Sequence, residues 1–244
     1  MLASLTGRLA DRHGFDIIHP FAVQPYNDAV AAKTAGTSKK IPPLPTFGRK
    51  RTAAVLLGHS NRMWPLFVDH LKAHPADVEL DHPLDTFLSA VIQPAVDDVT
   101  RLGAVSVDLR LSSDVGNKFV DLGCVAQVSG LAYYNDALHL SLHPTFGPWF
   151  AMRAVLVVDV DFDEQWVQVP SSTNPIEDLE GEISSQYEAL KAAGGIENWR
   201  CHWREWANLR KLGGRGVDEA YVYSEDQIEY HYTGNRDVLR RTIC

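Results

Sequence analysis

The chain contains several short runs in which apolar positions follow the period of a β-strand. In AVSVDLRLSSD (residues 104–114), valine and leucine recur at every second position, which is typical of a half-buried strand. The apolar runs FDIIHPFAVQP (15–25) and TAAVLLGHS (52–60) predict two further strands. We expect ALHLSLHP (137–144) and WFAMRAVLVVDVDF (149–162) to form a hairpin-like strand pair.

Other segments have the spacing and the end signals of helices. The predicted helices are residues 2–13 with a stop at Gly14, a helix capped by Ser60, a helix from 81–85 that Pro94 bends or splits, 117–134, 173–195 with Asn174 as N-cap, 196–211, and a last helix that opens with Ser224 and Gln227. The lysine- and proline-rich stretch 31–51 predicts a loop. Because strands and helices mix without strict βαβ alternation, we expect an α+β fold, in one domain over residues 1–244.

Composition narrows the function classes. The net charge is −8, so we expect no nucleic-acid partner, which would require a basic surface. The three cysteines lack C-x-x-C spacing, which argues against a disulfide framework and a structural zinc site. No apolar segment reaches the roughly 18 residues that span a bilayer, and the N-terminus lacks secretory features, so we expect a cytoplasmic protein without a membrane partner.

One arginine interrupts the apolar run around residue 153. If 149–162 is a regular strand, Phe150, Met152 and Ala154 share one face, while Arg153 lies on the other face with Val155. Both faces are apolar, so Arg153 must be paired or must open onto a cavity. The alternatives are a structural salt bridge and an anchor for a ligand carboxylate or phosphate.

Two further patterns were weighed for chemistry. Trp199, Trp203 and Trp206 have the i, i+4, i+7 spacing of one helix face, which forms either a core stripe or a wall that stacks on a conjugated ligand. His139 and His143 lie on a predicted strand, where positions i and i+4 are about 13 Å apart, too far to share one ion. We therefore expect no dedicated metal site.

Six segments, in order along nearly the whole chain, resemble the CblC family. They are GFDIIHPFAVQPYN, LPTF, HPLD, VSGLAYY, HPTFGPWFAMR and HWREW…VYSEDQIEYH. CblC proteins are cytosolic cobalamin-processing enzymes, active as cyanocobalamin reductase (cyanide-eliminating) and alkylcobalamin dealkylase. The resemblance implies a flavin-nitroreductase-like α+β sheet with flanking helices and a large cavity for base-off cobalamin. It also implies a reduced flavin (FMN or FAD) for decyanation and glutathione as the thiol for dealkylation.

The resemblance also implies site residues, though it assigns none of them a catalytic role. The cobalamin set is Asp108, Val120, Asp121, Leu122, Gly123, Gln127, Tyr134, Asn135, Asp136, His139, Ser141 and Met152. The glutathione set is Arg153, Trp206, Arg210 and Arg236.

The chain departs from the family at several of these positions. Gln127 stands where the family has a histidine, His139 where it has a glycine, and Ser141 where it has a cysteine. Pro148 replaces the second glycine of a Gly-Gly loop, and Leu209 replaces an arginine. His139 would narrow the pocket or offer an imidazole to cobalt. The alternatives are a nitroreductase-like flavoenzyme for another substrate and a non-catalytic cobalamin carrier. A homodimer or a downstream cobalamin-trafficking protein is a further expected partner.

Overall fold

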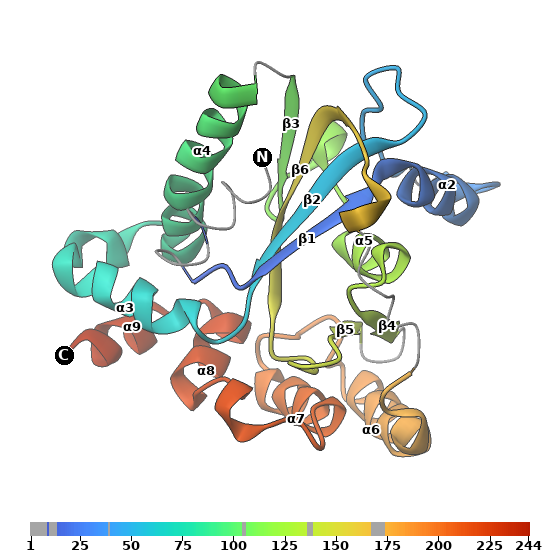
Figure 1. Cartoon of the computed structure of the whole chain (residues 1–244). Helices are drawn as coiled ribbons and strands as arrows, with labels where there is room; N and C mark the ends of the chain where they lie inside the picture. Colours follow the sequence, from blue (N-terminus) through green and yellow to red (C-terminus); the bar gives the residue numbers. More distant parts are fainter. Residues whose placement is uncertain (1–8, 10–13, 39, 104–105, 136–138, 167–173) are drawn as a thin grey trace.

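A computed structural model describes residues 9, 14–38, 40–103, 106–135, 139–166 and 174–244. Its main feature is a four-stranded sheet in the order β1-β2-β6-β3, in which every neighbouring pair is antiparallel (Figure 1). The strands are β1 (Ile17–Ala22), β2 (Thr52–His59), β6 (Ala151–Asp161) and β3 (Val107–Leu111). The mixture of an antiparallel sheet with helices confirms the α+β class.

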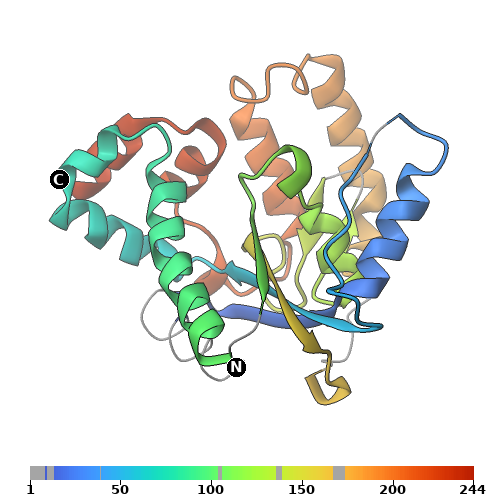
Figure 2. The same ribbon diagram turned by 90° about the horizontal axis from the view of Figure 1, so that it is seen from above.

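Helices cover both faces of this sheet (Figure 2). One core joins Leu57, Leu156 and Val158 to α3 (Met63–Ala73) and α4 (Pro83–Gly103), and it also takes in α8 (Glu225–Thr233) and α9 (Arg236–Ile243). A second core joins Val155 and Val157 to α2 (Val23–Thr34) and α5 (Leu122–Ser129). The alternation predicted for β3 is confirmed, since Val107, Leu109 and Leu111 all pack against the first core.

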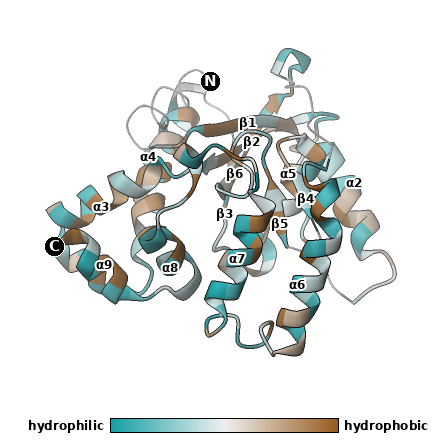
Figure 3. Ribbon diagram, turned by 90° about the horizontal axis from the view of Figure 1, so that it is seen from below, coloured by the Kyte–Doolittle hydropathy of each residue, from teal (hydrophilic) through white to brown (hydrophobic). Residues whose placement is uncertain are grey.

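The rest of the chain forms a second, smaller unit of structure beside the sheet. Strands β4 (Tyr133–Asn135) and β5 (Leu140–Leu142) pair with each other, and Leu142 packs in one apolar cluster with α6 (Glu180–Ala192) and α7 (Trp203–Gly213). In Figure 3, α6 and α7 carry hydrophilic bands, whereas β1 and β2 are mainly hydrophobic. Short 3₁₀ helices cover Pro75–Glu79, Gly116–Lys118, Glu164–Trp166, Glu177–Leu179 and Glu219–Tyr221.

The strand pairing predicted from the sequence differs from the pairing in the structure. β5 pairs with β4 and not with β6, so the predicted hairpin of 137–144 with 149–162 is wrong. β6 lies between β2 and β3, because its two apolar faces allow it to be buried on both sides in the middle of the sheet.

Several helix boundaries also differ from the prediction. Helix α2 occupies residues that were expected to be strand and loop, and α5 ends at Ser129 because Gly130 adopts a left-handed conformation. Residues 193–202 form turns, so Trp199 lies outside α7 and the tryptophan stripe is wrong. Ser60 and Asn174 do not cap α3 and α6, whose N-caps are Arg62 and Leu179.

Other expectations hold or lie outside the described part. Ser224 is confirmed as N-cap, since its hydroxyl accepts a hydrogen bond from the Gln227 amide. Pro94 does not split α4. The predicted helix 2–13 lies outside the described residues except for Leu9, which is buried. Among the described helices, none is long and apolar enough to cross a bilayer.

Candidate functional site

A β-bulge in β6 determines where Arg153 points. In the pairing with β2, Leu57 lies opposite Ala154 and Gly58 lies opposite Met152, so the register skips Arg153. A bulge residue reverses the alternation of side chains along a strand. Met152 therefore packs on the α2–α5 side with Val155, whereas Arg153 reaches α4 on the other side. The face assignment expected for a regular strand is wrong at this point.

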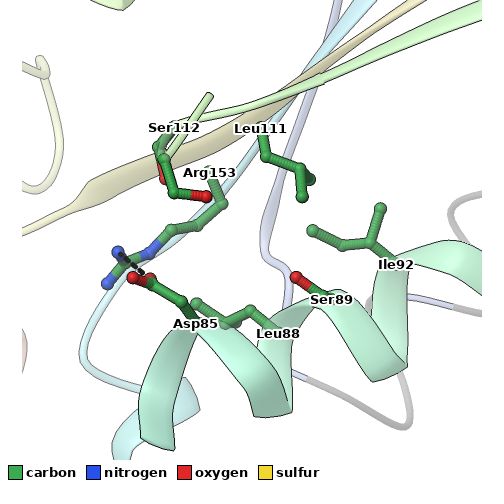
Figure 4. A pocket seen from close by; sticks show the side chains of 8 residues that line it. Asp85, Leu88, Ser89, Ile92, Leu111, Ser112 and Arg153 are labelled. Atoms are coloured by element: carbon green, nitrogen blue, oxygen red, sulfur yellow. Dashed lines mark ion pairs between the residues drawn. The ribbon is translucent and has the colours of Figure 1, made fainter. Parts of the chain in front are cut away.

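The Arg153 side chain is 12% exposed, and the protein satisfies only part of its hydrogen-bonding capacity. Its Nε donates a hydrogen bond of 2.9 Å to Nε2 of His59, and its Nη1 lies 3.9 Å from Oδ1 of Asp85 (Figure 4). The second distance is too long for a hydrogen bond. Within the described part of the chain, the remaining guanidinium N–H groups have no acceptor. Burial lowers the pKa of Arg153 below its ordinary value, as expected for a cation that lacks full compensation.

His59 is a neutral hydrogen-bond acceptor for this arginine. It is fully buried at the end of β2, and its Nδ1 lies 2.8 Å from the Ser60 carbonyl. Burial, followed by the nearby Arg153 charge, lowers the pKa of His59 to about 3. Arg153 donates to Nε2 of His59, so Nε2 must be the nitrogen without a proton. We therefore assign the imidazole proton to Nδ1, which donates to the Ser60 carbonyl.

Arg153 opens onto a pocket of about 230 Å³. The start of α4 contributes Asp85 to its wall, the turn before α7 contributes Trp199 and Arg200, and the end of α8 contributes His231. A much smaller hollow, shown in Figure 4, lies behind Arg153 against Leu88 and Ser89 of α4 and Ser112. A largely buried cation thus opens onto a pocket whose wall also carries a carboxylate, that of Asp85.

The structure divides the predicted glutathione set. Arg153 lines the pocket, and Arg236 forms an ion pair of 3.3 Å with Asp81 in its wall. Trp206 and Arg210 are not among the described residues that line it. The Trp206 indole donates to the Gly195 carbonyl at 3.0 Å.

Arg210 is buried in a separate cluster, where its Nε and Nη2 have hydrogen-bond partners. It donates to the carbonyls of Pro148 and Phe150, with a shortest distance of 2.6 Å. Its guanidinium also lies over the rings of Trp149 and Tyr223. These contacts indicate that Arg210 stabilises the packing here, while its place in the glutathione set stays a prediction.

Most of the predicted cobalamin set gathers around α5 and the β4–β5 pair. Asp121 caps α5 by accepting from the Cys124 amide at 3.0 Å, and its other oxygen pairs with Lys33 of α2 at 2.8 Å. The Tyr134 amide donates to the Gln127 side chain at 2.6 Å. The Tyr134 ring also lies against Gly123, where an added Cβ would come within 2.9 Å of it. Val120, Leu122 and Asn135 lie in the same segments.

The remaining members of the predicted cobalamin set differ in their burial and in their hydrogen-bond partners. Ser141 of β5 is buried, and its hydroxyl has no hydrogen-bond partner in the described structure. His139 has a φ of +49°, a left-handed conformation that glycine adopts without strain, and its Nε2 lies 3.2 Å from the Tyr187 hydroxyl. Asp108 of β3 is paired with Arg110 and Lys118. Asp136 lies outside the described residues.

Sequence reasoning missed Asp85 and Arg200 as pocket residues, and it considered Trp199 only as part of a tryptophan helix face. Asp85 belongs to HPLD, one of the segments that carried the resemblance, but its polar side chain gave no sign of a partner. His59 ends a buried apolar strand, and this was the available signal that its side chain would be buried and used.

The fold and the site together define a class: an antiparallel α+β protein with a buried arginine pocket at one end of its central strand. Within this class the assignment is definite. The sequence model of the methylmalonic aciduria and homocystinuria type C family matches residues 14–240, and the chain belongs to this family. This confirms the resemblance found in the sequence.

A solved structure gives the same result for the fold. The crystal structure of a C. elegans B12-trafficking protein CblC, described as a human MMACHC homologue, matches with a TM-score of 0.71 and 20% identity. The match covers 99% of this chain and 94% of that one. No curated protein matches the sequence.

Proposed function

We propose that this chain binds cobalamin and removes its upper axial ligand, by reductive decyanation, by glutathione-dependent dealkylation, or by both. Family membership supports the cobalamin substrate, and the solved relative is described as B12-trafficking. The observation that carries the proposal is the guanidinium of Arg153, a member of the thiol set, which opens onto a pocket and uses only its Nε in a hydrogen bond within the described structure. Its neighbour in β6, Met152, is a member of the predicted cobalamin set.

The residues on the cobalamin side suit a large amide-bearing ring. The α5 helix has small or apolar residues in its first turn, and Gly123 allows the close approach of the Tyr134 ring, another member of the predicted set. The unpartnered Ser141 hydroxyl would bond to a peripheral amide. In the described structure the Gln127 amide is engaged by Tyr134, which makes it a support for β4.

The residues on the thiol side suit an anionic co-substrate. A guanidinium with free N–H groups binds a carboxylate through two parallel hydrogen bonds. In dealkylation the thiolate sulfur takes the alkyl group as a thioether, and the electron pair of the cobalt–carbon bond stays on cobalt. In decyanation a reduced flavin, FMN or FAD, supplies the electrons and cyanide leaves.

The first test is a visible-absorbance titration of the protein with cyanocobalamin in the absence of reductant. A shift to the base-off spectrum supports cobalamin binding, whereas an unchanged spectrum with micromolar cyanocobalamin left free refutes it. Turnover of methylcobalamin with glutathione, and of cyanocobalamin with reduced flavin, then separates an enzyme from a carrier. A tightly bound yellow flavin without cobalamin binding would favour the nitroreductase-like alternative.

A further inference from the structure

We propose that the Arg153 pocket recognises the α-amino-acid headgroup of its ligand, with Arg153 binding the carboxylate and Asp85 binding the ammonium group. This inference deepens the proposed function and rests on its thiol co-substrate, because it specifies which end of glutathione enters the pocket. It also makes Asp85 a specificity-determining residue.

Asp85 has an acceptor group that the protein leaves open. It lies in the first turn of α4, and its side chain is 41% exposed toward the pocket. A carboxylate only accepts hydrogen bonds. Within the described structure Asp85 forms none, and the Arg153 guanidinium at 3.9 Å is beyond hydrogen-bond distance. The position therefore suits a cationic donor from a ligand.

The other charged groups of the pocket either have a partner in the protein or are exposed to solvent. Asp81 is paired with Arg236 at 3.3 Å. The Arg200 guanidinium lies 5.2 Å from the centre of the Trp199 ring, and Trp199 is 42% exposed. Among the described residues of the pocket, Arg153 and Asp85 are a neighbouring pair of opposite charges, joined by an ion pair of 3.9 Å without a hydrogen bond, and a ligand could bind to both. Their separation matches a headgroup in which an ammonium and a carboxylate share one carbon atom.

The size of the pocket selects one end of a tripeptide. Pockets that enclose drug-sized ligands occupy roughly 300–1,000 Å³. The Arg153 pocket, at about 230 Å³, is smaller and takes part of such a molecule. In glutathione, only the γ-glutamyl end carries both an ammonium and a carboxylate on one carbon, since the glycine end carries a carboxylate alone. The γ-glutamyl end therefore enters, and the cysteine thiol stays toward the mouth.

The experiment compares two unreactive peptides by calorimetric titration of the whole chain. S-methylglutathione keeps the free ammonium, whereas N-acetyl-S-methylglutathione lacks it. The wild type is expected to bind the first about tenfold or more tightly, the size of one charge-assisted hydrogen bond. Asp85→Asn should reduce this ratio to below about threefold, while Asp97→Asn, an exposed change on the same helix, should keep it.

Each outcome decides the question. Equal binding of the two peptides by the wild type overturns the headgroup assignment, whatever the variants do. An Asp85→Asn variant that weakens both peptides equally would show that Asp85 acts by orienting Arg153, and would overturn its role as the ammonium site. If neither peptide binds, the thiol part of the proposed function fails with this inference, while the separate cyanocobalamin titration still tests the cobalamin part.

Discussion

The buried Arg210 can be tested by replacing it with methionine, which fills a similar volume without donors. The change leaves the Pro148 and Phe150 carbonyls without their arginine partner in a buried site. An unsatisfied buried acceptor costs about 1–3 kcal/mol. The lost stacking of the guanidinium on Trp149 and Tyr223, at 5.4 and 5.1 Å, adds to this cost. Burying a neutral side chain in place of a cation offsets part of the loss.

We therefore expect Arg210→Met to lower the free energy of unfolding by about 3 kcal/mol, which lowers Tm by about 6–12 °C in a chain of this length. Urea unfolding followed by tryptophan fluorescence measures this, since Trp149 lies beside the substitution. The control is Lys211→Met, which removes only the exposed ion pair with Glu225 and should cost less than about 1 kcal/mol. A stable Arg210→Met protein that has lost glutathione-dependent activity would refute the structural role and support the role implied by the resemblance.

Three further changes test the backbone and the buried imidazole. His139→Gly should be about 1 kcal/mol more stable than His139→Ala in urea unfolding, since both lose the imidazole but only glycine relieves the left-handed φ. Gly58→Ala should unfold at a clearly lower temperature, because its Cβ would lie 2.7 Å from the Ala151 carbonyl oxygen; Gly181→Ala, where the Cβ meets open space, should not. His59 has a folded-state pKa of about 3, below the value near 6.5 of an unfolded chain, so its contribution to stability is present above pH 6.5 and is lost as the pH falls toward 3. Unfolding midpoints from pH 7 to 4 should therefore fall less steeply, by about one proton, in His59→Gln; an unchanged slope would contradict the assignment.

The parts of the fold that local sequence could predict are those with a complete local signal. The period-2 run of β3 and the apolar run of β2 were identified, and so was the Ser224 cap, because each depends on residues close together in sequence. Helix α2 also carried such a signal. Its buried Val23, Tyr26 and Val30 have helical spacing. The helix was missed because Pro25, which is tolerated in the first turn, was taken as the end of a strand.

The orientation of Arg153 could not be predicted, because it depends on a register between strands far apart in the sequence. The bulge exists only in the pairing of β6 with β2, about a hundred residues earlier. The same holds for the pocket, since Asp85 and Trp199 come together through tertiary packing alone. The family resemblance predicted that Arg153 binds the thiol co-substrate. The strand pattern alone was equally consistent with a structural salt bridge. The structure shows an ion pair of Arg153 with Asp85 at 3.9 Å, and the ligand anchor stays a prediction.

The bulge in β6 keeps the apolar layers on both sides of the sheet continuous. A charged side chain in the middle of a two-sided strand would normally interrupt one apolar layer. Here the extra residue stands outside the pairing with β2, so Ala154 and Met152 on its two sides each continue the layer to which they belong. The strand can thus carry a charged side chain toward α4 without interrupting the apolar layer on either side. Deletion of Arg153 would restore a regular strand and would remove this charge from the sheet.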